Sequence, residues 1–336
     1  SRERGEPIDL TFLKAKIAAA LRPREALYGK TSSSGGTYRA VFGEADGLPG
    51  LVIDRFQGAW VVEPHALGMY VQKDLIVEAL KEFAGNDAII FRTDSRSAQM
   101  EGMEVGAALV HGALPEGGAF AVEDGIRFPV DPLSGQKTGF FFDQRENRAF
   151  FQRWVAGTVA AGNKNLRVLD LFCHAGAWGL RALKAGAAHA TFVDSSASAL
   201  EMVKAAAKGM GMEDKITCIQ ADALEAVKGL EKRGYDAVAL DPPALIPNKK
   251  SIPAGVKAYR DLNLEAALKV ARGGAFATSS CSYHLDEARF EELVARSLVE
   301  CAREGRVIFR GGLSADHPFL PGMEEGRYLK SLLLQF

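Results

Sequence analysis

The sequence predicts an α/β protein in which a small α+β domain, residues 1–130, precedes a Rossmann-like, doubly wound domain, residues 131–336. Two observations predict this organisation. From residue 167 onward, short apolar runs alternate with helical segments, which is typical of a parallel sheet with helices on both faces. Before residue 131, short strand-like runs and hairpin-like pieces are separated by turn residues and a helical segment, which is typical of a small α+β domain.

Length and composition limit the number of domains and the kinds of site that the chain can contain. The 336 residues suffice for about two domains. The net charge of −1 creates no global attraction for nucleic acid, so any polyanion site must be a local basic patch. The four cysteines include no CxxC pair, which disfavours a zinc site, and no apolar run predicts a membrane span or signal peptide. We therefore expect a cytoplasmic protein. Because the chain begins at Ser1, we also expect processing or a missing upstream segment.

The N-terminal part is expected to form short elements separated by turns. These are helices at 10–21 and 71–83, strands at 38–42, 51–56, 59–62 and 88–92, a loop at 31–36, and hairpin-like pieces at 105–111 and 120–130. The last piece turns at 123–125, where Asp-Gly is a turn signal.

The C-terminal part is expected to alternate. Helices are predicted at 144–156, 177–185, 197–209 and 262–271, and strands at 167–172, 190–194, 215–220, 237–241 and 275–279. Prolines and a glycine between residues 247 and 255 predict a mobile loop there.

Acidic residues follow three successive predicted strands. Ligands of open α/β sheets bind beyond the carboxyl ends of the strands, where Asp170, Asp194 and Asp222 would meet. Asp194 could accept hydrogen bonds from ribose hydroxyls, and Asp222 could contact an adenine amino group. Gly176, which has no Cβ, would let the backbone approach the ligand.

This pattern favours S-adenosylmethionine (SAM) as the cofactor. A dinucleotide would need G-x-G-x-x-G, but only Gly176 and Gly179 stand here. The competing interpretation is that the aspartates merely cap helices. The rest of the predicted cofactor site consists of Phe172, His174, Ser195, Ala223, Asp241 and Pro242.

Cys281 follows the strand at 275–279 and is the predicted nucleophile. Carbon 5 of cytosine becomes nucleophilic when a thiolate adds to carbon 6, so cytosine-5 methylation needs a cysteine beside the cofactor. Asp241, in the turn Asp241–Pro243, could hydrogen bond the ring as the thiolate adds. The competing interpretation is a small buried cysteine.

Other candidates are weaker. Cys173 adjoins the cofactor loop and should point at the cofactor, while His174 and His284 are possible bases. Ala244 and Leu245 follow the DPP turn, where an enzyme that methylates adenine amino groups would carry an aromatic residue. That absence argues against adenine as the substrate.

Two long motifs resemble one family. Residues 137–148, KTGFFFDQRENR, and residues 41–55, VFGEADGLPGLVIDR, are similar to the RlmI-like 23S ribosomal RNA cytosine-5 methyltransferases, as are His317-Pro318 and Tyr328–Lys330. The resemblance covers nearly the whole chain. Members usually begin with a PUA RNA-binding domain, and this chain starts just after the place where it would end. They also usually carry an aromatic residue where Leu245 stands, which leaves stacking on the base open.

The resemblance implies SAM as the cofactor, ribosomal RNA as the partner, Cys281 as the nucleophile and a possible homodimer. It also implies cofactor or active-site contacts for Phe140, Asp143, Gln144 and Arg145. Expected phosphate contacts are Arg92, Arg96, Arg145, Arg148, Arg153, Lys249 and Lys250. Two alternatives stay open: methylation of another base, such as a guanine nitrogen, and a non-catalytic RNA-binding assembly factor.

Overall fold

The structure, a computed structural model, describes residues 7–29, 36–133 and 138–336. The chain separates into two compact units, Ser1–Phe142 with Ala315–Gly322, and Asp143–Ser314 with Met323–Phe336. The first unit thus extends twelve residues beyond the predicted boundary, and the chain returns to it at Ala315–Gly322, the returning segment. The domain boundary after residue 130 stays a prediction. Most of the predicted loop at 31–36, and Lys137 of the long motif, lie outside the described residues.

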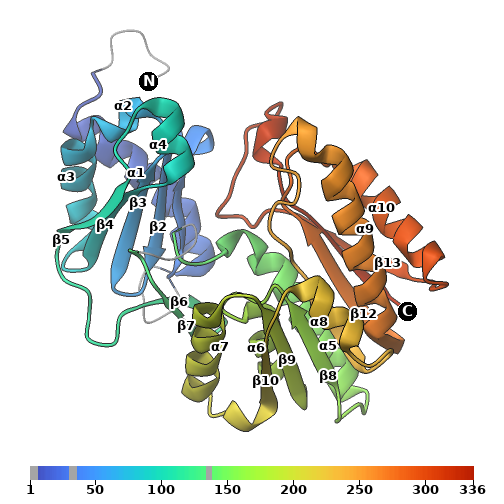
Figure 1. Cartoon of the computed structure of the whole chain (residues 1–336). Coiled ribbons are helices and arrows are strands. Elements are labelled where there is room, and N and C mark those ends of the chain that lie inside the picture. The colour runs from blue at the N-terminus through green and yellow to red at the C-terminus, as the bar shows by residue number, and fades with distance from the viewer. Residues whose placement is uncertain (1–6, 30–35, 134–137) are drawn as a thin grey trace. The chain divides into compact units, whose positions relative to one another are not determined.

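The first unit contains a mixed five-stranded sheet of order β1-β2-β3-β4-β5 (Figure 1). Its strands are β1 (Tyr38–Phe42), β2 (Leu51–Phe56), β3 (Ala59–Pro64), β4 (Ala88–Thr93) and β5 (Gly106–His111), and its helices are α1 (Leu10–Tyr28), α2 (Leu67–Tyr70), α3 (Lys73–Ala84) and α4 (Ser95–Glu101). Side chains of α1 and α3 form one apolar core with the sheet. This arrangement confirms the predicted α+β class.

A separate hairpin joins β6 (Ala119–Glu123) to β7 (Ile126–Val130). Its turn residues Asp124 and Gly125 have φ angles of 51° and 72°, as the tight turns that suit twisted strands require. The predicted turn is therefore confirmed. The piece at 105–111 instead pairs with β4.

Helix α1 continues seven residues past its predicted end. The extension includes Pro23, and it carries Arg24 into a buried position. There Arg24 donates to both carboxylate oxygens of Asp46, at 2.8 and 2.7 Å, and to the carbonyl of Asp316 in the returning segment. These contacts stabilise the added residues of α1, which the local sequence did not predict to be helical.

The second unit contains a seven-stranded sheet of order β10-β9-β8-β11-β12-β14-β13. The strands are β8 (Arg167–Leu171), β9 (His189–Asp194), β10 (Ile216–Gln220), β11 (Tyr235–Leu240), β12 (Val270–Ser280), β13 (Arg306–Gly311) and β14 (Lys330–Gln335). Neighbours from β10 to β12 are parallel, whereas β14 is antiparallel to both β12 and β13. The doubly wound prediction is confirmed for the first five strands.

The helices of this unit are α5 (Arg145–Ala160), α6 (Ala177–Lys184), α7 (Ala197–Gly209), α8 (Ala223–Gly229), α9 (Ile252–Lys269) and α10 (Glu287–Glu300). Helices α8, α9 and α10 share one apolar core with the sheet, and α6 packs against both α5 and α7. The chain runs outward from β8 to β9 and β10 on one side, and from β11 to β12 on the other. A topological switch point therefore lies between β8 and β11, the usual ligand position in such sheets.

Helix α9 begins ten residues before its predicted start. Residues 252–255 of the predicted mobile loop form its first turn, and Lys249–Ser251 form a short 3-10 helix before it. Pro253 is tolerated because the first helical turn needs no backbone donor there. Gly255 is also a packing residue, since a Cβ would lie 2.3 Å from Ile246 Cγ1 and 2.6 Å from the Leu245 carbonyl oxygen. Among the described residues, no helix combines the length and apolar character needed to cross a membrane.

Candidate functional site

The turn between β8 and α6 is held by Asp170. This residue is fully buried, and its Oδ2 accepts a 2.9 Å hydrogen bond from the Gly179 backbone N–H. Burial raises the pKa of Asp170 well above its usual range, and the nearby Asp241 and Asp194 carboxylates raise it further. Oδ1 has no hydrogen bond among the described residues. Direct contact of Asp170 with a cofactor stays a prediction.

Close packing around this turn requires glycine at two positions. Gly176 has a φ of 76°, and a Cβ there would lie 2.9 Å from Val203 Cγ2. At Gly179 a Cβ would lie 2.4 Å from Phe192 Cε1. Phe172 and His174 also have positive φ angles, 58° and 47°, so the loop is tightly wound. Packing against β9 and α7 therefore leaves no room for a Cβ at either glycine. Close approach of Gly176 to the cofactor stays a prediction.

Asp194 ties this loop to the end of β9. Its Oδ2 accepts from the His174 backbone N–H and its Oδ1 from the Ser196 backbone N–H, both at 2.9 Å. Ser195 is exposed beside it. The carboxylate thus lies at the rim of the strand ends, where the sequence predicted a ribose contact.

Asp222 has the local role that the competing interpretation gave to such residues. Its Oδ1 accepts from Leu224 and Glu225 at 2.9 and 3.1 Å and caps α8. Ala223, the first residue of α8, is buried. Contact of Asp222 with adenine stays a prediction.

Asp241, just beyond β11, faces the same strand-end region. Its Oδ1 accepts from Gln144 Nε2 at 2.8 Å, and its Oδ2 accepts from Trp178 Nε1 at 3.2 Å. Burial raises the pKa of Asp241 to about 6, and the Asp143 charge adds to the effect, while the Trp178 and Gln144 hydrogen bonds and Arg148 oppose it. Carboxyl groups from three neighbouring strands therefore gather at the switch point.

The segment that precedes α5 joins this region. Gln144 Oε1 accepts from Asn147, which also donates to the Gly312 carbonyl. Asp143 Oδ2 accepts a 2.7 Å hydrogen bond from the Tyr328 hydroxyl. Arg145 is buried, and its carbonyl accepts from Arg181. Of the residues that the family resemblance implied, Asp143, Gln144 and Arg145 lie in the second unit.

Phe140 lies in the other unit. There its ring packs 5.2 Å from those of Phe128 and Phe142. A cofactor contact of Phe140 stays a prediction.

Cys281 lies directly after β12, and its thiol points to the DPP turn after β11. The Sγ atom is 3.9 Å from the carbonyl oxygen of Pro242, the residue after Asp241. Cys281 is partly exposed. Cys173, by contrast, is buried, and burial raises its thiol pKa above the usual range, as it does for Cys218 and Cys301. The structure brings the predicted nucleophile and Asp241 together on neighbouring strands.

Three contributors were not predicted from the residues alone. Trp178 and Asn147 lie in the first turns of α6 and α5, and Tyr328 precedes β14. The available signal was a side-chain donor in the first turn of a helix: an indole after the end of β8 for Trp178, and an amide just after Gln144 for Asn147. For Tyr328 the only signal was its match to a family motif.

The expected phosphate contacts divide by exposure. Arg148 is 2% exposed and Arg145 is also buried, so neither is a surface cation. Arg153, Lys249 and Lys250 are exposed. The side chain of Arg96 lies outside the described residues.

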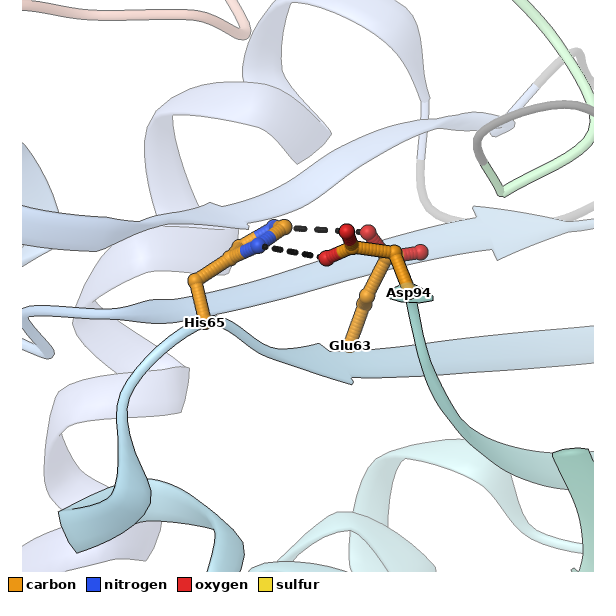
Figure 2. Close-up of side chains that lie close together, drawn as sticks. All are labelled: Glu63, His65 and Asp94. Atoms are coloured by element: carbon orange, nitrogen blue, oxygen red, sulfur yellow. Dashed lines mark ion pairs between the residues drawn. The ribbon is translucent and has the colours of Figure 1, made fainter. Parts of the chain in front are cut away.

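A second cluster of ionisable side chains lies in the first unit (Figure 2). His65 Nε2 is 3.4 Å from Glu63 Oε1, and His65 Nδ1 is 3.3 Å from Asp94 Oδ2. Arg92 Nε lies 3.5 Å from Glu63 Oε2. Burial raises the pKa of Glu63, while His65 and Arg92 oppose the shift. Because basic groups face both carboxylates, ion pairing accounts for the cluster.

Comparison with known proteins gives sequence relatives over nearly the whole chain. The protein is 35% identical to a ribosomal RNA large subunit methyltransferase I of Shewanella amazonensis, over 98% of this chain and 82% of the relative. It is 33% identical to one from Photobacterium profundum, over 98% and 81%. Residues 145–252 match a family model described as conserved hypothetical protein 95.

Solved structures share the fold. One, described as "SMU.776, a putative methyltransferase complexed with SAH", superposes with a TM-score of 0.81 at 18% identity, covering 99% of this chain and 83% of the other. At that identity, the likeness bears on the fold alone.

Proposed function

Because the chain belongs to the ribosomal RNA large subunit methyltransferase I family, we propose that it methylates carbon 5 of a cytosine in 23S ribosomal RNA, using SAM and a covalent Cys281 intermediate. The observation that carries the proposal is the position of Cys281. Its thiol lies 3.9 Å from the Pro242 carbonyl, next to Asp241, at the carboxyl ends of neighbouring strands.

The charge of the strand-end region supports SAM. Asp170, Asp194 and Asp241 gather there, and Asp170 Oδ1 is a buried acceptor without a hydrogen bond among the described residues. A ligand with a sulfonium and an ammonium group would favour the ionised forms of Asp170 and Asp241, which burial disfavours. When bound, SAM supplies an electrophilic methyl group. Asp194 would hold its ribose at the rim, where its carboxylate is already fixed by His174.

The chain's own residues would perform the remaining chemistry. The Cys281 thiolate would add to carbon 6 of the base and form a carbon–sulfur bond, which makes carbon 5 nucleophilic toward the methyl group. Loss of the carbon 5 proton to a base would then expel the Cys281 thiolate. Asp241 accepts from Gln144 and Trp178, so its carboxylate is fixed to receive the exocyclic amine of cytosine. To reach Cys281, the base must be single-stranded or flipped out of a helix.

The test is methyl transfer from labelled SAM to ribosomal RNA that lacks its own modifications, followed by nucleoside analysis. Wild type should form 5-methylcytosine, and Cys281→Ala should form none. Cys301→Ala should behave as wild type, because Cys301 is the cap residue after the carboxyl end of α10 and is not one of the proposed site residues. A different methylated base that survives Cys281→Ala would replace the proposal with direct transfer to another position. Absence of any methylated product, with RNA still bound, would favour a non-catalytic assembly factor.

A further inference from the structure

Lys330 is a buried lysine next to the predicted nucleophile. It is 6% exposed and begins β14, the strand antiparallel to β12. In the register of these strands, Lys330 pairs with Ser280, the residue before Cys281. Lysine is rarely buried without a partner for its charge, so the position calls for an explanation.

The groups that hold Lys330 are neutral. Its Nζ donates to the Ser282 carbonyl at 2.7 Å and to the Tyr328 carbonyl at 2.8 Å. Among the described residues, no carboxylate lies within ion-pair distance of Lys330. Ser280 and Ser282 flank Cys281. The ammonium group of Lys330 donates to the Ser282 carbonyl, and the residue itself pairs with Ser280 in the strand register.

The loop that carries Cys281 is fixed from a second direction. Ser282 Oγ accepts from the Ile246 backbone N–H at 3.1 Å and lies 3.0 Å from the Tyr259 hydroxyl. Ser282 and Tyr259 are both fully buried. These contacts hold the Cys281 loop against Ile246 and α9, so the Ser282 carbonyl that accepts from Lys330 has a fixed position beside Cys281.

We propose that Lys330 is a positioning residue whose ammonium charge stabilises the thiolate form of Cys281. This inference rests on the proposed function, because it explains how the nucleophile of that reaction is made reactive. The Cys281 proton leaves to solvent before the base arrives, and Lys330 keeps its own protons throughout. The thiolate is the species that adds to carbon 6, so its population sets the rate of the first step.

The surrounding charges agree with this role. Burial lowers the pKa of Lys330 to about 8, while the Cys281 charge is the largest influence in the opposite direction, followed by Asp286 and Glu287. Burial raises the pKa of Tyr259, which keeps that hydroxyl neutral beside the thiol. Lys330 thus places a cationic group against the backbone next to Cys281, whose thiol lies 3.9 Å from the Pro242 carbonyl.

The test measures thiolate formation directly, without RNA or SAM. The rate of Cys281 alkylation by iodoacetamide, resolved by peptide mass spectrometry, is followed against pH in wild type, Lys330→Met and Lys330→Arg. In Lys330→Met the midpoint should rise by about one pH unit, which lowers the rate at pH 7 about tenfold. Lys330→Arg keeps the charge and should recover part of the loss.

Lys269→Met is the matched control. Lys269 is a lysine of the same unit with 1% exposure, and it also donates to backbone carbonyls, those of Lys228 and Leu230. Its removal should leave the Cys281 midpoint unchanged. An equal midpoint in wild type and in folded Lys330→Met would overturn the inference.

A reciprocal measurement covers the case in which Lys330→Met fails to fold. Coupling between two charges must act on both partners. Cys281→Ala should therefore lower the Lys330 midpoint seen by carbon-13 NMR, and an unchanged midpoint would count against the inference. The two proposals fail separately: 5-methylcytosine with no alkylation shift removes only the role of Lys330, while a shift without methylation removes only the proposed reaction.

Discussion

Replacing Asp241 by asparagine should make the second unit more stable at neutral pH, although Asp241 is a proposed catalytic residue. Burial raises the pKa of Asp241 from 3.8 to about 6, so the folded state disfavours the charged carboxylate. A raised pKa contributes stability that is fully present below pH 3.8 and is lost as the pH rises through about 6. Asparagine cannot ionise and avoids this loss.

The magnitude follows from the shift. At about 1.4 kcal/mol per pKa unit, the charged carboxylate costs about 3 kcal/mol at pH 8 and about 1.5 kcal/mol at pH 5. Asparagine can still accept from Gln144, but its amide loses the hydrogen bond from Trp178, at a cost of about 1 kcal/mol. The variant should therefore exceed wild type by about 2 kcal/mol at pH 8 and by about 0.5 kcal/mol at pH 5.

Urea unfolding at several pH values between 5 and 8 checks this prediction. Asp236→Asn is the matched control, because it removes an aspartate from the other end of the same strand. The informative quantity is how the stability difference between variant and wild type changes with pH. A lost hydrogen bond lowers the free energy of unfolding by the same amount at every pH, so it does not contribute to that change. A stability difference that stays constant from pH 5 to pH 8 would refute the reasoning about burial.

Three further predictions concern packing, cofactor binding and the first unit. Gly179→Ala should lower the free energy of unfolding by about 1–3 kcal/mol in urea, because its Cβ would lie 2.4 Å from Phe192; unchanged stability would show that the turn relaxes freely. Asp194→Ala should weaken SAM binding about tenfold to a hundredfold in calorimetry, through the loss of charged hydrogen bonds, and equal affinity would remove Asp194 from the site. Arg24→Met should cost about 3–5 kcal/mol in urea unfolding, because it leaves the Asp46 carboxylate buried without its partner; a loss below 1 kcal/mol would contradict that account.

The sequence predicted well those features that depend on local pattern. Alternating apolar runs gave the parallel strands β8 to β12, and an Asp-Gly pair gave the β6–β7 turn. Strand ends in a parallel sheet meet at one edge, so Asp194, Asp241 and Cys281 could be expected together before any coordinates were known.

Features decided by tertiary contacts were harder to predict. Pro253 and Gly255 suggested a loop, but one is tolerated in a first helical turn and the other allows close packing against Ile246. Spacing along the chain indicated a cofactor contact for Asp222 and did not show that its Oδ1 also caps α8; the contact stays a prediction. Whether a carboxylate satisfies its own backbone or faces a ligand depends on neighbouring residues that spacing along the chain does not reveal.

The direction of strand β14 explains why Lys330 and Tyr328 were not predicted as site residues from the sequence pattern. In a parallel strand, the residues near the ligand edge are those at its carboxyl end, so a search for site residues looks there. Because β14 runs opposite to β12, its amino end lies at that edge, with Lys330 paired to Ser280. The carboxyl end of β14 pairs instead with Ala275, five residues back along β12. One reversed strand thus brings a lysine and a tyrosine to the strand ends, where the lysine lies beside Cys281 and the tyrosine holds Asp143.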